Sequence, residues 1–402
     1  MKILVLNSGS SSQKSYLYEL REPLPVRAPA PLWQGKIEWE GERAVVEVRS
    51  AAGGSFKEEV TSKGRAEATA QLLDALSDGP ARAVSDKTEV EAVGHRIVNG
   101  GPDYRQPARV NPAVKAAIEK AAVFAPLHNR VELEGIRLIE ETFSGVPQVA
   151  VFDTGFHRSM PDAAAIYAGP YEWAEQGIRR YGFHGINHQY CAERAAQLLG
   201  RNLEELRLVN CHLGNGCSLA AIRGGVSVDT TMGFTPLEGL VMGTRSGSID
   251  PGILTFLMRE KKMTGNELDD LLNKKSGLLG VSGASSDMRE IVAAMKNGNA
   301  RARLAFDIFA HRLRTGIGAM IAALGGTDAL IFTAGIGENS PEVRAAACAN
   351  FDFMGLELNE AANQAARRDQ EISTRTSKVR VLVLKAEEDW AIAKECWKVL
   401  QG

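Results

Sequence analysis

The sequence predicts an α/β fold, and an internal similarity is compatible with two related halves. The chain has 402 residues, the length of two or three domains of ordinary size. Short apolar runs typical of buried strands alternate with segments of helical periodicity along the whole chain. Residues 4–9 and 208–214 also share one pattern, an apolar strand followed by a polar turn that contains glycine. Because such units are common, this last pattern fits either a duplicated fold or coincidence.

In the first half, a polar turn at residues 7–10 joins two strands, and Asn111 with Pro112 marks the start of a helix that stops before Pro126. The expected strands are 2–6, 15–20, 43–48 and 148–152, and the expected helices are 63–77, 112–125 and a further one to about 143.

The second half repeats this alternation. The expected strands are 206–211, 218–222, 328–332 and 379–384, with a tight turn at 333–339. Ser340 with Pro341 marks one further helix, and residues 387–389 precede the last one. A long helix over residues 301–324 is expected to bury a stripe through Leu304, Ile308, Leu313, Ile317 and Ile321.

Composition excludes several classes of protein. Lys and Arg total 47 against 49 for Asp and Glu, a net charge of −2, which argues against a nucleic-acid or membrane-surface protein. No apolar run approaches the ~18 residues of a membrane span. The five cysteines contain no C-x-x-C pair, which argues against a disulfide framework and a zinc site. Without an export signal, we expect a cytoplasmic protein.

Three glycine-containing turns have the chemistry of phosphate binding. Residues 7–14 combine hydroxyl groups with Lys14, residues 212–216 form an Asn-Gly hairpin, and residues 333–339 lie between a strand and a helix. Each also fits an ordinary structural turn. The chain contains neither a Walker A loop nor a G-x-G-x-x-G dinucleotide motif.

Acidic and basic residues at the ends of apolar runs add to this picture. Asp153 and Glu388 suit a hard cation such as Mg²⁺, although helix capping explains Glu388 equally well. Arg96 and Arg245 are isolated in apolar, glycine-rich stretches and need an anionic partner, either a structural carboxylate or a substrate. His184 lies in a crowded cationic run that suits developing negative charge. These features together predict an ATP-dependent phosphotransferase for small molecules, without protein-kinase motifs.

A set of sequence strings, in order, makes the chain resemble the acetokinase family from residue 1 to about residue 397. The strings are N-S-G-S-S-S-x-K at 7–14, G-H-R-I-V-x-G-G at 94–101, A-P-L-H-N at 125–129, F-D-T-x-F-H-x-x-M-P at 152–161, R-R-Y-G-F-H-G-I at 179–186, H-L-G-N-G at 212–216, D-T-T-M-G-F-T-P-L-E-G-L at 229–240, M-G-T-R-S-G at 242–247, S-G-L-L-G-V-S-G at 276–283, S-S-D-M-R at 285–289 and F-T-A-G-I-G-E-N-S-P-E-V-R at 332–344.

The resemblance implies the two-domain, duplicated α/β fold of sugar kinases, actin and heat-shock ATPases, with the ligand cleft between the domains. It implies reversible transfer of the γ-phosphoryl group of ATP to acetate, giving acetyl phosphate and ADP, with Mg²⁺ and with Mn²⁺ as a substitute. It also implies a homodimer. The expected domains are a substrate-side domain, residues 1–153 plus 389–402, and a nucleotide-binding domain, residues 154–388.

The resemblance also implies a role for each matching residue. Asn7 and Glu388 are expected near the metal, and Asp153, His184, Arg96 and Arg245 are expected to be catalytic. The expected acyl pocket and substrate contacts are Arg96, Val98, Leu127, Phe183 and Pro236. The expected nucleotide contacts are Ser12, Lys14, His212, Leu213, Gly214, Asn215, Gly216, Asp287, Met288, Arg289, Gly335, Ile336, Gly337 and Asn339.

Several positions depart from the family's usual residues: Gln13, Ser15, Asn99, Arg130 and Ser248, together with the poorly matched stretch 21–60. None of these positions has a role in the expected chemistry. A propionate kinase would share the same strings, because one methylene in an apolar pocket changes binding by only ~1–3 kcal/mol. A non-catalytic, ATP-gated interaction module is the alternative outside enzymes, and Arg96, Asp153, His184 and Arg245 argue against it.

Overall fold

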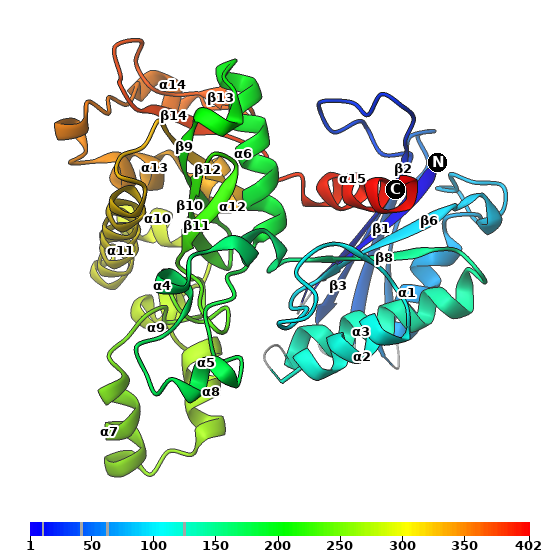
Figure 1. The fold of residues 1–402 in the computed structure, drawn as a ribbon, viewed down its shortest axis with the longest axis horizontal. Helices are drawn as coiled ribbons and strands as arrows, with labels where there is room; N and C mark the ends of the chain where they lie inside the picture. Colours follow the sequence, from blue (N-terminus) through cyan, green and yellow to red (C-terminus); the bar gives the residue numbers. More distant parts are fainter. Residues whose placement is uncertain (10–11, 41–42, 62–63, 124–125) are drawn as a thin grey trace. The chain divides into compact units, whose positions relative to one another are not determined.

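The structure is a computed structural model that describes residues 1–9, 12–40, 43–61, 64–123 and 126–402. The chain divides into two compact units (Figure 1). The first unit is Met1–Gly155 with Glu387–Gly402, and the second is Phe156–Ala386. No helix of the described residues is long and apolar enough to cross a membrane.

The first unit contains a mixed eight-stranded sheet in the order β5-β4-β3-β2-β1-β6-β8-β7. Its central strands β1, β6 and β8 are parallel, and β2 to β5 continue the sheet as an antiparallel meander. The strands are β1 (Lys2–Ser8), β2 (Ser12–Glu19), β3 (Trp33–Glu40), β4 (Arg43–Ser50), β5 (Ser55–Thr61), β6 (Ala92–Ile97), β7 (Ala108–Arg109) and β8 (Gln148–Phe152).

Helices cover both faces of this sheet (Figure 1). The helices α1 (Arg65–Asp74) and α3 (Pro126–Thr142) pack on one face, where Leu4, Trp33 and Leu72 are fully buried. The last helix, α15 (Glu388–Gln401), contacts β1, β6 and β8. Gly94 permits this approach, because a Cβ there would lie 2.9 Å from the side chain of Ile392.

The helix α2 (Pro112–Ala121) begins as the sequence predicted. The side chain of Asn111 accepts a hydrogen bond from the backbone N–H of Val114, and Pro112 occupies the first turn. The poorly matched stretch after residue 20 forms β3, β4 and part of β5, and a 3₁₀ turn, η1 (Lys87–Glu89), precedes β6. The predicted strands and helices of the first half are therefore confirmed, with small shifts at their ends.

The second unit contains a six-stranded sheet in the order β11-β10-β9-β12-β14-β13. The strands β9, β12 and β14 are parallel, and β10 and β11 are antiparallel to their neighbours. The strands are β9 (Arg207–Leu213), β10 (Cys217–Arg223), β11 (Val226–Thr230), β12 (Ala329–Thr333), β13 (Gln370–Glu371) and β14 (Arg380–Val383).

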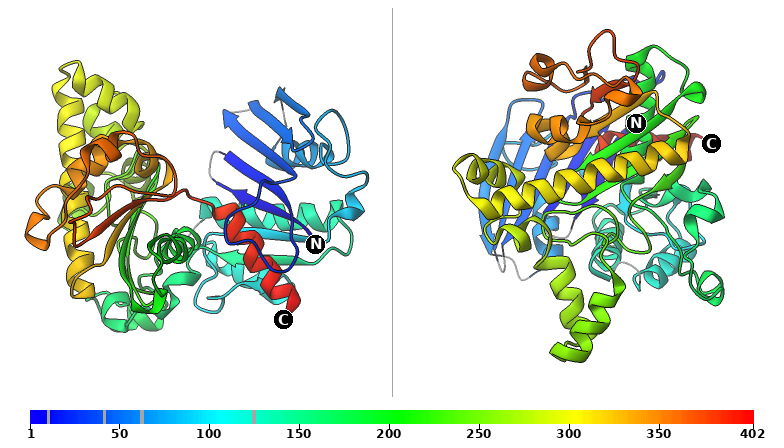
Figure 2. Two further views of the ribbon diagram at one scale, coloured as in Figure 1. Left: turned by 90° about the horizontal axis from the view of Figure 1, so that it is seen from above. Right: turned by 90° about the vertical axis from the view of Figure 1, so that its left-hand side faces the viewer.

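Two long helices pack on this second sheet. The helix α6 (Gly185–Leu199) contacts β9 and β12, and the long helix α11 (Ala300–Leu324), drawn in yellow in Figure 2, contacts β9, β10 and β11. The remaining helices are α4 (Asp162–Ala165), α5 (Glu172–Glu175), α7 (Pro251–Lys261), α8 (Gly265–Lys274), α9 (Gly277–Ser282), α10 (Met288–Lys296), α12 (Ala334–Asn339), α13 (Pro341–Cys348) and α14 (Glu360–Gln364), with 3₁₀ turns η2 (Gly155–Ser159), η3 (Leu203–Glu205) and η4 (Asp352–Met354).

The two sheets share one topology. The order β3-β2-β1-β6-β8 in the first unit matches β11-β10-β9-β12-β14 in the second, with the same strand directions. The two similar runs of the sequence, 4–9 and 208–214, fall on the corresponding central strands β1 and β9. The duplicated α/β fold expected from the sequence is thus confirmed.

Two expectations for the second unit need correction. Residues 334–339 form the short helix α12 directly after β12, where the sequence predicted a turn. Leu304 is 52% exposed and does not belong to the buried stripe of α11. The buried face of that helix instead runs through Ala302, Ala305, Phe306, Phe309, Leu313 and Ile317, so Leu304 falls beside it.

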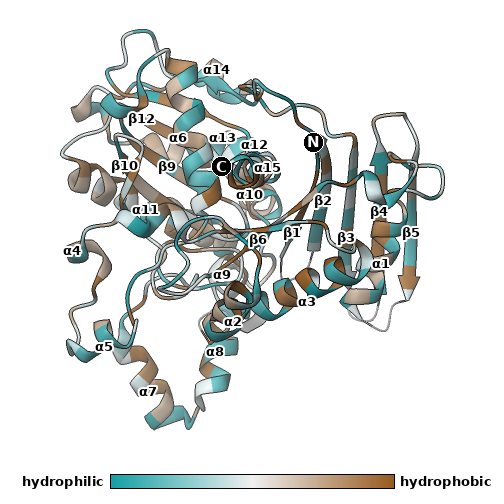
Figure 3. Cartoon of the chain, turned by 45° about the vertical axis from the view of Figure 1, so that its right-hand side comes forward, coloured by the Kyte–Doolittle hydropathy of each residue, from teal (hydrophilic) through white to brown (hydrophobic). Residues whose placement is uncertain are grey.

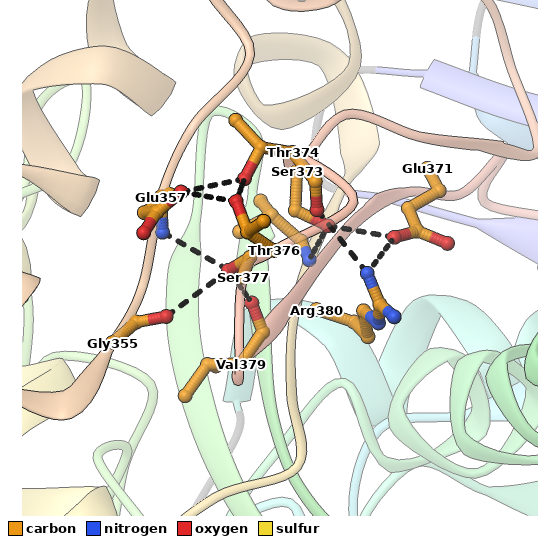
Figure 4. Close-up of polar contacts among 10 residues, drawn as sticks. Gly355, Glu357, Glu371, Ser373, Thr374, Thr376, Ser377, Val379 and Arg380 are labelled. Atoms are coloured by element: carbon orange, nitrogen blue, oxygen red, sulfur yellow. Dashed lines mark hydrogen bonds and ion pairs between the residues drawn. The ribbon is translucent and has the colours of Figure 1, made fainter.

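A polar network closes the loop before β14 (Figure 4). The hydroxyl group of Ser377 donates to the carbonyl oxygen of Val379 at 2.6 Å and accepts from the backbone N–H of Glu357 at 3.0 Å. Ser377 is only 4% exposed, so these bonds satisfy a buried hydroxyl group at the start of the strand.

Candidate active site

In the first unit, the structure brings Arg96 and Asp153 together. Arg96 is near the end of β6, and Asp153 directly follows the neighbouring parallel strand β8. The guanidinium Nη2 of Arg96 lies 2.9 Å from Oδ2 of Asp153, whose carboxylate is only 1% exposed. Burial opposes the charge of Arg96, but the carboxylates of Asp153, Glu388 and Glu132 outweigh it and raise the pKa of Arg96 above its ordinary value. Within the described structure, Nε of Arg96 makes no hydrogen bond.

Glu132 is a buried acid of this region that the sequence analysis missed. Its Oε2 accepts a hydrogen bond from the backbone N–H of Val98 at 3.0 Å, and the residue is 3% exposed. Burial raises the pKa of Glu132 to about 8, although the charge of Arg96 works in the opposite direction. The spacing of residues along the helix could have indicated that Glu132 is buried. Glu132 lies on the same face of α3 as the buried residues Asn129 and Ile136.

Asn7 and Glu388, the residues expected near a metal ion, are also close together. The amide Nδ2 of Asn7 donates to Oδ1 of Asp389 at 3.0 Å and to Oε2 of Glu388 at 3.4 Å. Burial raises the pKa of Asp389 to about 6, while Asn7 and the nearby charge of Lys14 lower it. Among the described residues, no group of three or more His, Cys, Asp or Glu is arranged to hold a metal. Amide and carboxylate oxygens nevertheless fit Mg²⁺, which takes one or two protein carboxylates and completes its shell with phosphates and water.

The other predicted residues of the first unit lie nearby in sequence. Ser12 opens β2, and Lys14 is exposed and pairs with Asn7 across the β1–β2 hairpin. Val98 is buried directly after β6. Leu127 is in the first turn of α3, and its side chain lies outside the described residues, as do Ser10 and Ser11 of the first turn motif.

In the second unit, Arg245 and His184 approach the glycine turn at residues 214–216. A Cβ built on Gly216 would lie 3.4 Å from Nε2 of His184 and 3.5 Å from Nη1 of Arg245. His184 has a left-handed backbone with φ of 57°, an uncommon conformation for a residue with a side chain and one that clusters at functional sites. The absence of a side chain at Gly216 therefore leaves space that the side chains of His184 and Arg245 both border.

Arg245 differs from Arg96 in its partners. Its Nη1 donates to the carbonyl oxygen of Pro236 at 3.3 Å, and none of the ion pairs of the described residues involves Arg245. Burial lowers the pKa of Arg245 below its ordinary value, which means that the charge is desolvated without compensation by a carboxylate. Such a guanidinium has a strong preference for an anionic ligand.

Phe183, the other predicted acyl contact of this unit, is 1% exposed, and its carbonyl oxygen lies 3.1 Å from Nε2 of His157. His212 is at the end of β9, and its ring stacks on the ring of His184 at 4.0 Å between centroids.

A pocket of about 800 Å³ opens at the carboxyl end of the second sheet. Such an edge is where α/β folds bind ligands, and the N-terminus of α13 adds a favourable field for anions. It is lined by Gly214, Asn215, Ser286, Asp287, Met288, Arg289, Val292, Gly335, Ile336, Asn339, Ser340 and Glu342. Most of these residues were predicted from the sequence, whereas Ser286, Val292, Ser340 and Glu342 were missed.

Some predicted nucleotide contacts do not line this pocket. Leu213 is fully buried, and Gly337 is buried where α12 packs on β9. A Cβ on Gly337 would lie 3.3 Å from the backbone of Phe332, so this glycine permits close packing. His212 and Gly216 lie on the side of the turn that faces His184.

Several of the residues that depart from the family strings make local hydrogen bonds through their side chains, although Nδ2 of the buried Asn99 makes none within the described structure. Gln13 is buried and makes hydrogen bonds with the hydroxyl groups of Ser8, Ser15 and Thr69. Oδ1 of Asn99 accepts from the backbone N–H of Gly101 at 2.8 Å. The hydroxyl oxygen of Ser248 accepts from the backbone N–H of Gly239 at 3.0 Å, and Arg130 is exposed.

Known proteins resemble this chain over its whole length. An acetate kinase of Nostoc punctiforme is 56% identical over 405 residues and covers 100% of both chains. An acetate kinase of Gloeobacter violaceus is 56% identical over 407 residues, with the same coverage. Among solved structures, an acetate kinase of Porphyromonas gingivalis has a TM-score of 0.91 at 40% identity and covers 99% of each chain. A propionate kinase of Francisella tularensis has a TM-score of 0.90 at 35% identity, with 99% coverage of each.

The fold, the pocket and these likenesses define an ATP-dependent phosphotransferase whose acceptor is a carboxyl group. The chain belongs to the acetokinase family, whose sequence model matches residues 2–394. Enzymes of this family use ATP and Mg²⁺ in general. The resemblance recognised in the sequence strings is confirmed.

Proposed function

We propose that this protein catalyses the reversible, Mg²⁺-dependent transfer of the γ-phosphoryl group of ATP to acetate, giving acetyl phosphate and ADP. Relatives that share more than half of its residues over the full length are acetate kinases. Within the structure, the proposal rests on Arg245. Its guanidinium group is desolvated and forms no ion pair with a carboxylate of the described residues, and it borders, together with His184, the space left open beside Gly216. This arrangement suits a phosphoryl group that gains negative charge during transfer.

The acceptor needs little activation in this reaction. A carboxylic acid with a reference pKa near ~4 is already ionised at neutral pH and can attack phosphorus directly. Catalysis then depends on position and charge. We assign Arg96 to the substrate carboxylate, and Asp153 to the orientation of Arg96 through their ion pair.

Arg245, His184 and His212 are assigned to the transferring phosphoryl group. Asn7 and Glu388 are assigned to Mg²⁺, which would neutralise charge on the nucleotide phosphates, and Mn²⁺ is expected to substitute. The pocket beside α12 and α13 is assigned to the nucleotide, with Asp287 to Arg289 and Gly335 to Asn339 around its adenosine part. Ser12 and Lys14 of the β1–β2 hairpin are expected to contact the phosphates.

Acetate rather than propionate is the proposed acceptor. The acyl pocket is assigned to Val98, Leu127, Phe183 and Pro236. A comparison of kcat/KM for acetate, propionate and butyrate tests this assignment. A higher value for propionate than for acetate would make the acceptor preference wrong while leaving the reaction class intact.

The reaction itself is tested by trapping the acyl phosphate. Purified protein with MgATP and acetate should give a hydroxamate after addition of hydroxylamine, and omission of acetate should abolish the signal. Binding of ATP without any acyl phosphate, with either Mg²⁺ or Mn²⁺ present, would contradict the proposal and favour the non-catalytic module.

We also propose a homodimer. The helix α7 has no buried residue, and its apolar side chains Ile253, Phe256 and Met258 are 44%, 49% and 49% exposed. Figure 3 shows hydrophobic residues, in brown, along this helix. Such a surface is typical of a protein contact. Light scattering at micromolar concentration should give twice the chain mass of 43.3 kDa, and a monomer mass would contradict the proposal.

A further inference from the structure

Four of the seven histidines lie together in the second unit. His184 and His212 stack at 4.0 Å between ring centroids, and His188 lies 6.3 Å from His212 and 5.5 Å from His157. They come from η2, the start of α6, the first turn of α6 and the end of β9. Only His184 and His212 have an assigned role, so the presence of His188 beside them needs an explanation.

A continuous set of hydrogen bonds connects His188 to His184. Nδ2 of Asn210 lies 2.9 Å from Nδ1 of His188. Nε2 of His188 lies 2.8 Å from the hydroxyl oxygen of Ser218, and the same oxygen lies 2.9 Å from Nδ1 of His184. Asn210, His188 and Ser218 are each 0% exposed, so water does not compete for these bonds.

The amide group of Asn210, at one end of this set, determines the donor and the acceptor in each of its hydrogen bonds. The amide nitrogen of Asn210 only donates, so Nδ1 of His188 must accept, and the single proton of neutral His188 must be on Nε2. That proton is donated to the oxygen of Ser218. The hydroxyl proton of Ser218 is then directed to Nδ1 of His184, which leaves the ring proton of His184 on Nε2.

We propose that Asn210, His188 and Ser218 are positioning residues that fix His184 as the neutral tautomer with its proton on Nε2. This inference rests on the proposed function, in which His184 contacts the transferring phosphoryl group. Nε2 is the ring nitrogen nearest the open side of Gly216, which Arg245 also borders. We call the hydrogen-bonded set Asn210, His188, Ser218 and His184 the relay. The relay supplies a fixed N–H donor, rather than a lone pair, to the place where negative charge develops.

The surroundings keep the relay neutral. Burial, together with the neighbouring rings of His157 and His212, lowers the pKa of His188 well below its ordinary value. The ionisable groups that face His184 and His188 are His157 from η2, His212 from β9 and Arg245 near the turn. All three oppose a further positive charge, so His188 does not become a donor at both nitrogens in the neutral pH range.

The relay also explains why an amide rather than a carboxylate stands at position 210. A carboxylate would only accept, so it would draw the proton of His188 to Nδ1. Nε2 of His188 would then accept from Ser218, whose oxygen would accept from Nδ1 of His184. Neutral His184 would be left with a lone pair on Nε2, and only its protonated form would still offer an N–H there.

The first test reads the tautomer directly. The full-length protein labelled with ¹⁵N-histidine should show, by two-bond ¹⁵N–¹H correlation spectra, a neutral His184 with its proton on Nε2. The signals are assigned by their loss in the variant His184→Gln. A proton on Nδ1 of His184 in the unsubstituted protein would overturn the proposal, whatever the activity is.

The second test breaks the relay at its centre. Ser218→Ala should lower kcat about tenfold, with the KM for acetate and ATP little changed. A loss of this size is usual when a residue that orients an active-site side chain is removed. The matched control is Ser377→Ala, which removes another buried, hydrogen-bonded hydroxyl group from the loop before β14 (Figure 4) and should leave kcat unchanged. An equal loss of kcat in both folded variants would overturn the proposal in favour of a general structural effect.

Asn210→Asp provides a further readout if Ser218→Ala does not fold. Its kcat should be higher at acidic than at neutral pH, because in this variant only protonated His184 donates from Nε2. A pH profile identical to that of the unsubstituted protein would overturn the proposal. Failure to form any acetyl phosphate, with the Nε2 tautomer present in the spectra, would overturn the proposed function alone and would support the relay geometry.

Discussion

Arg245 and Arg96 show how two arginines with similar sequence surroundings differ in their partners. Arg96 is paired with the buried carboxylate of Asp153, whereas Arg245 is held by the carbonyl oxygen of Pro236. The sequence left a structural carboxylate and a substrate open as partners for both arginines. Only the three-dimensional structure separates them, because Asp153 is remote in sequence from Arg96.

The first prediction concerns the loss of each arginine. Arg245→Ala should fold normally and lose kcat on the order of 10²–10³-fold, and Arg245→Lys should restore little, because an ammonium lacks the planar fork. Arg96→Ala should raise the KM for acetate and also lower the melting temperature, because it leaves Asp153 buried without its partner. Melting temperatures and steady-state kinetics on the three variants check this. A folded Arg245→Ala variant with near-normal kcat would contradict the assigned site.

A second prediction uses the open side of Gly216. Gly216→Ala should fold, because the new methyl group meets His184 and Arg245 only at ordinary contact distances of 3.4 to 3.5 Å. It should nevertheless lower kcat by about 10²-fold, because the methyl group takes the space assigned to the phosphoryl group. The control is Gly318→Ala within α11, where nothing lies within 4 Å of the added atom. Unchanged activity of Gly216→Ala would remove the phosphoryl group from this position.

Glu132 gives a prediction about pH and stability. Its folded-state pKa is raised from the ordinary 4.5 to about 8, so the folded state binds a proton more tightly than the unfolded state. The contribution of Glu132 to stability is therefore full below pH 4.5 and is lost as the pH rises to about 8. Relative to the unsubstituted protein, Glu132→Gln should be about equally stable at pH 4.5 and more stable at pH 9. Parallel denaturation midpoints of the two proteins across this range would contradict the raised pKa.

At the scale of elements, the features predicted correctly from the sequence are those that depend on residues close together in the chain. Asn111 and Ser340 cap the helices α2 and α13 as expected, because capping depends on neighbouring residues alone. The helix α12 was missed, because residues 334–339 contain glycines that disfavour a helix unless tertiary packing supports it. The relay around His188 was missed for a similar reason, since Asn210 and Ser218 are ordinary strand residues until β9, β10 and α6 meet.

The packing that supports α12 includes Arg344, a fully buried arginine of α13. Its Nη1 donates to the carbonyl oxygens of Gly337 and Glu338 at 2.9 Å each, and its Nε donates to Oδ1 of Asn363 at 2.8 Å. Arg344 thus satisfies the backbone carbonyls at the end of α12, which borders the pocket assigned above to the nucleotide. The helix α12 therefore depends on a side chain of the helix that follows it, and not on its own propensity alone.

The fourth prediction follows from that dependence. Arg344→Met should lower stability by roughly 1–3 kcal/mol for each carbonyl oxygen left buried without a donor. It should raise the KM for ATP much more than the KM for acetate, because α12 lines the pocket that we assign to the nucleotide. The matched control is Arg314→Met, which removes an arginine that donates to Ala346 of α13 but not to α12. Equal changes of both KM values would contradict a role confined to the nucleotide pocket.

At the scale of the whole molecule, the first unit is completed by a helix that follows a strand of the second unit. The helix α15 comes directly after β14 of the second sheet but packs on the first sheet. The first unit therefore depends on the last residues of the chain for one face of its core. Trp390 of α15 is 0% exposed and packs edge-on against Tyr18 at 5.7 Å between centroids.

The last prediction is that damage to α15 affects the first unit selectively. Trp390→Ala should cost ~3–5 kcal/mol by leaving a cavity in the core of that unit. If the two units unfold separately, amide exchange should accelerate in β1, β6 and β8 while β9, β12 and β14 keep their protection. Phe309→Ala on α11, equally buried in the second unit, should give the reverse pattern. Acceleration of both sheets to the same extent by either substitution would mean that the units unfold as one cooperative body, even though their cores are built separately.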